Sequence, residues 1–176
     1  MRRDSRLGRL GLAATLLIVL IVAARESGFG NLFAAREFAG PARVVDGDSL
    51  EIAERRVRLF GIDAPELAQL CGDRSRRDYA CGERAREALE TLVGDAVLQC
   101  VTEGQDRFRR VLARCRTPDG VDIGAALVRA GWAVAYHGRD GRSYRTAESD
   151  AQRRRVGLWA GRFDRPEDWR RDHPSR

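Results

Sequence analysis

The chain has 176 residues, of which 43% are hydrophobic and 33% charged, and its formal net charge at pH 7 is +6. This length suits one globular domain plus a short extra segment and argues against a second full-size domain. All basic residues are arginine, whose planar guanidinium suits phosphate contacts. Because the base composition of the coding DNA can produce the same usage, composition alone does not indicate a phosphate-binding function.

Residues 1–24 have the pattern of a targeting segment. Four arginines precede an uncharged run of fifteen residues from Leu10 to Ala24. This run is shorter than the roughly 20 residues of a membrane-spanning helix but matches the core of a signal peptide, and small residues at its end offer a cleavage site. An uncleaved signal-anchor, with Arg25 at the membrane interface, is the alternative. We therefore expect export to the periplasm, cell envelope or medium, free or tethered to the membrane.

Cleavage after Ala24 would remove four arginines and Asp4, so that the formal charge would fall from +6 to +3. The net charge of the mature chain is therefore no argument for a nucleic-acid partner.

The next part of the chain predicts a linker and then a three-stranded meander. Residues 25–40 contain glycines and scattered apolar residues without a sustained period, so we expect a linker, with the folded domain over residues 41–160. Short apolar runs separated by turn sequences predict antiparallel strands joined by hairpins. These runs lie at residues 44–45, 50–52 and 57–62.

Helices and two further strands follow. Apolar residues at helical spacing between Ala85 and Val93 predict a helix that ends at Gly94. Asp122 is a suitable N-cap for another helix, which Gly131 would end. The two strands are expected at residues 96–101 and 110–115, a third, polar helix at about 144–156, and a polar C-terminal tail at 161–176.

Five strands, with a helix between the third and the fourth, predict a mainly β fold of the α+β class. The expected architecture is a five-stranded Greek-key barrel of the OB type with about three packed helices. An open α+β sheet would give the same order of elements and remains the alternative.

The four cysteines form two local pairs, Cys71 with Cys81 and Cys100 with Cys115. Export favours disulfides, and this pairing would close one loop after Glu66 and join two strands expected to be neighbours. Each bond would stabilise the fold by about 2 to 4 kcal/mol. Zinc is the rival, but nine and fourteen intervening residues match no usual ligand spacing.

Acids and an arginine gather around the meander: Asp48, Arg58, Asp63 and Glu66. Phosphodiester hydrolysis needs a hard cation, a base for the attacking water and fixed positive charge on the phosphate, and these residue types supply all three. Each residue also has an ordinary explanation, as a hairpin turn, a solvated charge, an Asx turn or an acid in the first turn of a helix.

Five segments in chain order together resemble the staphylococcal nuclease (thermonuclease) family. They are VVDGDSLEI, VRLFGIDAPE, DRFRRVLA, ALVRAGWAVAY and GLW, between about Ala42 and Trp159. The resemblance implies an OB-fold barrel with three helices that hydrolyses DNA and RNA with calcium. It implies a phosphodiesterase of the endonuclease type that leaves 3′-phosphate ends, with single-stranded nucleic acid as the favoured substrate. No exposed heptad or long apolar edge suggests anything beyond a monomer.

The resemblance assigns the metal site and the base. Asp48 and Asp63 look like the carboxylate ligands of calcium, and the carbonyl of Ala64 looks like the backbone ligand. Glu66 resembles the residue that orients or deprotonates the attacking water. Ala64 stands where the best-known members carry threonine, but only a carbonyl is needed at that position.

The resemblance also assigns the phosphate contacts. Arg58 and Arg110 look like the pair that grips the phosphate and stabilises its transition state. Arg107 and Tyr136 are positioned like residues that contact the bound nucleotide. Two departures put substrate affinity in question: Arg109 replaces a glycine before the phosphate-gripping arginine, and Gly138 stands where an aromatic residue is expected.

A non-catalytic OB module that binds single-stranded nucleic acid is the rival interpretation. It would have no reason to keep Asp48, Arg58, Asp63, Glu66 and Arg110 together. A structural, envelope-tethered interaction domain would also leave these five residues unexplained. The run Arg153, Arg154 and Arg155 suggests a solvated helix face, with contact to a nucleic-acid backbone as its alternative.

Overall fold

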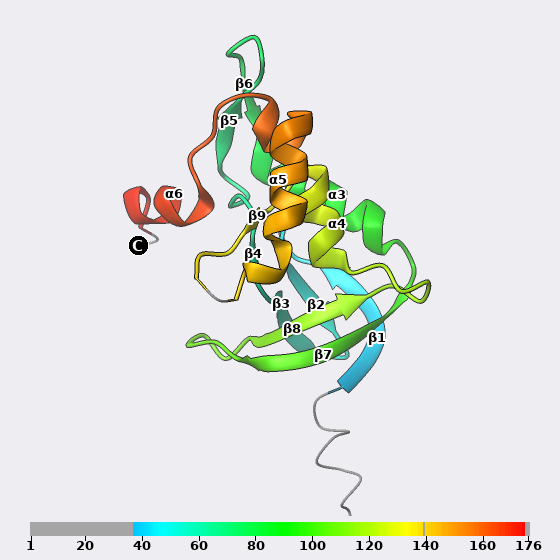
Figure 1. Cartoon of the computed structure of the whole chain (residues 1–176). Coiled ribbons are helices and arrows are strands. Elements are labelled where there is room, and N and C mark those ends of the chain that lie inside the picture. Colours follow the sequence, from blue (N-terminus) through cyan, green and yellow to red (C-terminus); the bar gives the residue numbers. More distant parts are fainter. Residues whose placement is uncertain (1–36, 139, 175–176) are drawn as a thin grey trace, which may run out of the picture. The chain divides into compact units, whose positions relative to one another are not determined.

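The computed structural model describes residues 37–138 and 140–174 (Figure 1). The expected targeting segment and most of the expected linker lie outside the described residues. The first strand, β1 (Glu37–Val44), begins before the expected domain start, so that residues 37–40 belong to the barrel. None of the helices within the described ranges combines the length and hydropathy that crossing a bilayer requires.

Five strands form a closed barrel in the order β1-β2-β3-β8-β7. Neighbouring strands are antiparallel except β3 and β8, which run parallel. Closure leaves no free sheet edge. This confirms the expected five-stranded barrel of the OB type. The strands after β1 are β2 (Ser49–Ile52), β3 (Arg55–Leu59), β7 (Val97–Gln105) and β8 (Val111–Arg116).

Side chains along β2 and β3 point in turn into the apolar core and to the outer face of the barrel. Leu50 and Ile52 of β2, with Val57 and Leu59 of β3, are buried in the main apolar core. Successive side chains of a strand point to opposite faces, so Arg58 lies on the outer face. Its partner in the register is Ser49 of β2, the residue after Asp48. The barrel pattern thereby brings Arg58 beside the Asp48 turn.

Within the described residues, four α-helices and two 3₁₀ segments accompany the barrel. Helices α3, α4 and α5 pack together on one side of it in Figure 1, as the sequence predicts. Asp122 caps α4 by accepting a hydrogen bond from the N–H of Ala125 at 2.9 Å. Helix α6 lies in the segment expected to be a polar tail. The bounds are α3 (Cys81–Val93), α4 (Ile123–Ala130), η1 (Arg142–Tyr144), α5 (Arg145–Arg154), η2 (Gly157–Ala160) and α6 (Pro166–Asp172).

Two small sheets complete the part of the fold that the structure describes: β4 (Ile62–Asp63) with β9 (Val134–Ala135), and β5 (Leu70–Gly72) with β6 (Asp78–Ala80). The first pairing continues with a hydrogen bond from the N–H of Tyr136 to the carbonyl of Gly61, at 2.9 Å. It therefore brings Tyr136 close to the chain that carries Asp63.

Both expected disulfides are present. One joins Cys71 of β5 to Cys81 at the start of α3. The other joins Cys100 of β7 to Cys115 of β8, which are partners in the strand register. With all four sulfurs bonded, no free cysteine is left for a zinc site.

Candidate functional site

A groove of about 1120 Å³ runs over β3, the β7–β8 turn and α6. The candidate residues converge there. Asp63 is buried beside it, at 2% exposure, and is connected to it through Arg58. The candidate residues in its lining are Asp48, Arg58, Ala64, Glu66, Arg107, Arg110 and Tyr136.

The Asp48 carboxylate is buried and held from three sides. Its side chain accepts hydrogen bonds from the N–H of Ala64, at 2.9 Å, and from the hydroxyl of Ser49, at 3.2 Å, and it forms an ion pair with Arg58. Burial raises the pKa of Asp48 to about 7, even though the charge of Arg58 opposes this rise. The carboxylate is therefore short of compensating positive charge.

Arg58 connects the two aspartates. One guanidinium nitrogen pairs with Asp48, and the other lies 2.6 Å from Oδ1 of Asp63. Burial lowers the pKa of Arg58, but the charges of Asp48 and Asp63 outweigh this and raise it above its ordinary value. A positive charge is thus permanently fixed between the two carboxylates.

Arg170 of α6 is a site residue that the sequence analysis did not identify. Its guanidinium lies 2.9 Å and 3.1 Å from the two carboxylate oxygens of Asp63, and 2.9 Å from Oε1 of Glu66. Burial alone would lower the pKa of Arg170, but its bonds to Asp63 and Glu66 raise it. The C-terminal helix therefore places a cation on an expected metal ligand and on the expected base.

Contacts before α6 explain why it docks there. The buried side chain of Gln69 donates to the carbonyl of Asp164 at 2.7 Å. Arg165 donates to the carbonyl of Ala135 at 3.1 Å and pairs with Glu148 of α5. Pro at the start of α6, with acids in its first turn and arginines in its last, is a helix signature that could have predicted the helix. The docking position depends on these tertiary contacts.

Glu66 is held by its backbone while its side chain reaches the groove at 38% exposure. The N–H of Gln69 donates to the carbonyl of Glu66 at 2.8 Å. Helix α3 begins directly beneath this carbonyl, since a Cβ on Gly82 would lie 1.8 Å from it. Only glycine permits so close an approach, and Gly82 therefore allows the backbone of Glu66 to pack directly against the start of α3.

Arg110 is positioned by Asp106, another residue that the sequence analysis missed. The Asp106 side chain accepts from the N–H groups of Phe108 and Arg110, both at 2.9 Å, and pairs with Nε of Arg110 at 2.7 Å. Arg109 adopts a left-handed conformation with φ +64°, a region that glycine favours. The turn therefore keeps a glycine-like shape although arginine stands there.

The oxygen donors of the site suit a hard divalent cation. No group of three or more histidine, cysteine, aspartate or glutamate side chains within residues 37–138 and 140–174 is placed to hold a metal. A metal ion would depend on Asp48, Asp63, a backbone oxygen and water, a combination that calcium accepts. With Glu66, three carboxylates face the two guanidinium groups of Arg58 and Arg170, so that the cluster keeps a net negative charge.

Comparison with known proteins identifies the family. A family model described as staphylococcal nuclease homologue matches residues 56–161. The chain belongs to the staphylococcal nuclease family. This confirms the resemblance found in the sequence and the nuclease class expected from it. Staphylococcal nuclease relatives are generally metal-dependent, in agreement with the donor set above.

Several relatives align over most of the chain. A succinoglycan biosynthesis protein, ExoI, of Rhizobium meliloti (strain 1021) is 35% identical over 90% of this chain and 83% of its own length. The protein ParB of Escherichia coli is 34% identical over 93% of this chain and 92% of its own. A micrococcal nuclease of Shigella flexneri is 34% identical over 73% and 78% of the two chains.

Proposed function

We propose that this member of the staphylococcal nuclease family is an exported, calcium-dependent nuclease that hydrolyses phosphodiester bonds of DNA, RNA or both and leaves 3′-phosphate ends. The observation that supports this most directly is the convergence of two buried aspartates, Arg58, Glu66 and Arg110 on one groove. The groove is large enough for several nucleotides, and we expect single-stranded nucleic acid to be favoured because its bases can be spread apart.

Asp48, Asp63 and the carbonyl of Ala64 would hold the calcium ion. Bound there, calcium would supply positive charge to the oxygens of the phosphate. Arg170 now contacts both oxygens of Asp63, so we expect it to give up these contacts when the ion binds. Arg58 would remain as the fixed cation beside the aspartates.

The chain's own residues supply the rest of the chemistry. Glu66, freed from Arg170, accepts a proton from the attacking water, whose oxygen bonds to phosphorus. The bond between phosphorus and the 5′ oxygen breaks, and the leaving 5′ oxygen takes a proton from solvent water. Arg58 and Arg110 stabilise the additional negative charge on the phosphate in the transition state, and Asp106 keeps Arg110 oriented for this role. Arg107 and Tyr136, which line the same groove, contact the nucleotide.

Export to an oxidising compartment fits the two disulfides, because such bonds persist outside the cytoplasm. The apolar run that ends at Ala24 would be either a cleaved signal peptide or an anchor in the membrane. Calcium near millimolar outside the cytoplasm suits a weak, open site. We expect the protein to act as a monomer.

The test is a gel assay of the purified full chain on denatured DNA and on RNA, first with calcium and then with an excess of chelator. We expect cleavage that stops when calcium is removed, and products that accept a label at the 3′ end only after phosphatase treatment. Equal degradation under both conditions would exclude the metal role. Binding without any cleavage would favour the non-catalytic OB module.

A further inference from the structure

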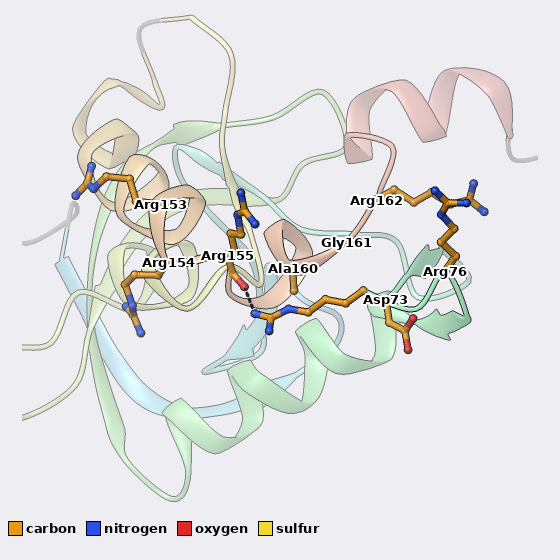
Figure 2. A pocket seen from close by; sticks show the side chains of 9 residues that line it. Asp73, Arg76, Arg153, Arg154, Arg155, Ala160, Gly161 and Arg162 are labelled. Atoms are coloured by element: carbon orange, nitrogen blue, oxygen red, sulfur yellow. Dashed lines mark hydrogen bonds between the residues drawn. The ribbon is translucent and has the colours of Figure 1, made fainter.

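A second hollow, of about 590 Å³, lies between the β5–β6 hairpin and the end of α5 (Figure 2). Among the described residues, none belongs to the lining of both this hollow and the candidate active groove. We call it the arginine hollow, because six of its nine lining residues are arginines: Arg74, Arg76, Arg153, Arg154, Arg155 and Arg162.

These arginines are largely unneutralised. Within the described part of the chain, only Arg153 among the six has a carboxylate partner, Asp150. Asp73, the one acid in the lining, pairs with Arg77 and accepts from the N–H groups of Ser75 and Arg77. Arg84 and the half-buried Arg86 on α3, by contrast, pair with glutamates of their own helix. The arginine hollow therefore concentrates positive charge that internal ion pairs do not consume.

Hydrogen bonds and one disulfide connect the segments that form the arginine hollow. The backbones of Gly72 and Arg162 exchange two hydrogen bonds, at 2.9 Å and 3.0 Å. Arg74 donates to the carbonyl of Arg155 at 3.1 Å, which connects the hairpin to the end of α5. The disulfide of Cys71 fixes the hairpin to α3. Because the backbone is held in this way, the arginines are presented at set positions on the surface.

The arginines are distributed along the hollow and do not converge on one point. Figure 2 shows Arg153 and Arg154 at one end, Arg155 in the middle, and Arg76 beside Arg162 at the other end. A single small anion would need donors directed at one centre, whereas a row of guanidinium groups matches the successive phosphates of a strand.

We propose that the arginine hollow binds the phosphate backbone of a single nucleic-acid strand, as a second contact for substrates long enough to leave the active groove. This rests on the proposed function, since it assigns the hollow to the same substrate. For the run from Arg153 to Arg155, the proposal selects contact with a nucleic-acid backbone over a solvated helix face. The hollow adds affinity for long strands and takes no part in the chemistry, because no residue of the groove lines it.

The test variant is the full chain with Arg76→Gln and Arg154→Gln, which removes two charges from the arginine hollow. The matched control is Arg43→Gln with Arg84→Gln, which removes two charges from exposed positions outside both hollows. Affinity for a fluorescent single-stranded DNA of 5 nucleotides and for one of 40 nucleotides is measured over a salt series. All proteins carry Glu66→Gln, so that the DNA stays intact during the measurement.

Each lost phosphate contact lowers the salt slope for a single strand by about 0.7. The double variant should therefore reduce the slope for the 40-nucleotide strand by about 1.4 and weaken its binding on the order of tenfold at 0.15 M salt. Binding of the 5-nucleotide strand should not change, and the control should behave as the parent does.

An unchanged slope for the long strand, or an equal reduction in the control, would overturn the proposal. Loss of binding to phosphatidylserine vesicles with intact binding of the long strand would assign the hollow to a membrane surface and would also overturn it. Failure of the proposed function would appear in a different measurement, as absence of calcium-dependent cleavage by the protein that keeps Glu66. The salt slope of strand binding does not depend on cleavage and would still test the arginine hollow.

Discussion

Replacing Arg170 with alanine should tighten calcium binding, because its guanidinium competes with the ion for the oxygens of Asp63. The substitution removes two contacts to Asp63, at 2.9 Å and 3.1 Å, and one to Glu66, at 2.9 Å. Arg58 would still pair with Asp48 and Asp63, so the substitution leaves neither aspartate without a partner.

The size of the effect follows from the exposure of the pair. A hydrogen bond to a charged group contributes about 1.5 to 3 kcal/mol when it is shielded from water. The Arg170 side chain is 36% exposed, so solvent screening reduces the sum of its contacts to about 1 kcal/mol. Loss of this competition corresponds to a dissociation constant for calcium that is about fivefold lower.

Isothermal titration calorimetry of the full chain with calcium measures the change. The matched control is Arg171→Ala, which removes the same charge from the neighbouring position, where the partner is the exposed Asp168. We expect the control to bind calcium as the parent does. If Arg170→Ala bound calcium no more tightly than the control, Arg170 would not compete with the ion for Asp63. If the variant also lost cleavage at unchanged calcium affinity, Arg170 would instead contact the phosphate.

Three further substitutions test other parts of the site and fold. Glu66→Gln should slow cleavage of denatured DNA by about 10²- to 10⁴-fold with little change in DNA affinity; an equal loss of both, by gel and binding assays, would show that Glu66 acts only in binding. Replacing Cys100 and Cys115 with serine should lower the free energy of unfolding by about 3 kcal/mol for a loop of 15 residues, as urea titration would measure; an unchanged midpoint would contradict it. Arg109→Gly should leave the cleavage rate within about twofold, because Asp106 orients Arg110; a rate lowered tenfold would mean that Arg109 itself contacts the substrate.

The barrel was predictable because its strands carry strong local signals. Apolar residues alternate along β2 and β3, and turn sequences separate these strands. Asp122 and Gly131 delimit α4 in the structure as they do in the sequence. The beginning of β1 was missed because residues 37–40 gain their structure from pairing with β7, a contact that no local pattern records.

The candidate site was only partly predictable, for a related reason. Motif spacing located Asp48, Asp63, Glu66 and Arg110, which lie within the segments that resemble the family. It did not predict Arg170, which reaches the site from more than a hundred residues away. The docking of α6 depends on tertiary contacts, among them the bond from Gln69 to Asp164.

The role of Arg58 also needed the structure. The sequence predicts a phosphate contact for Arg58, and in the fold Arg58 also bridges the two aspartates. A strand pattern gives the face on which a side chain lies but not the partner that it finds there. The same holds for Asp106, whose acceptor role in the β7–β8 turn is visible only once the turn is formed.

Hydrolysis by this protein should require an ion held by Asp48 and Asp63. Measuring calcium occupancy by calorimetry and the cleavage rate of denatured DNA on the same protein, across one calcium series, tests this directly. We predict one calcium per chain and a rate that rises in proportion to occupancy. A cleavage rate that is already maximal without bound calcium, or a protein fully occupied by calcium that does not cleave DNA, would contradict this requirement for the ion.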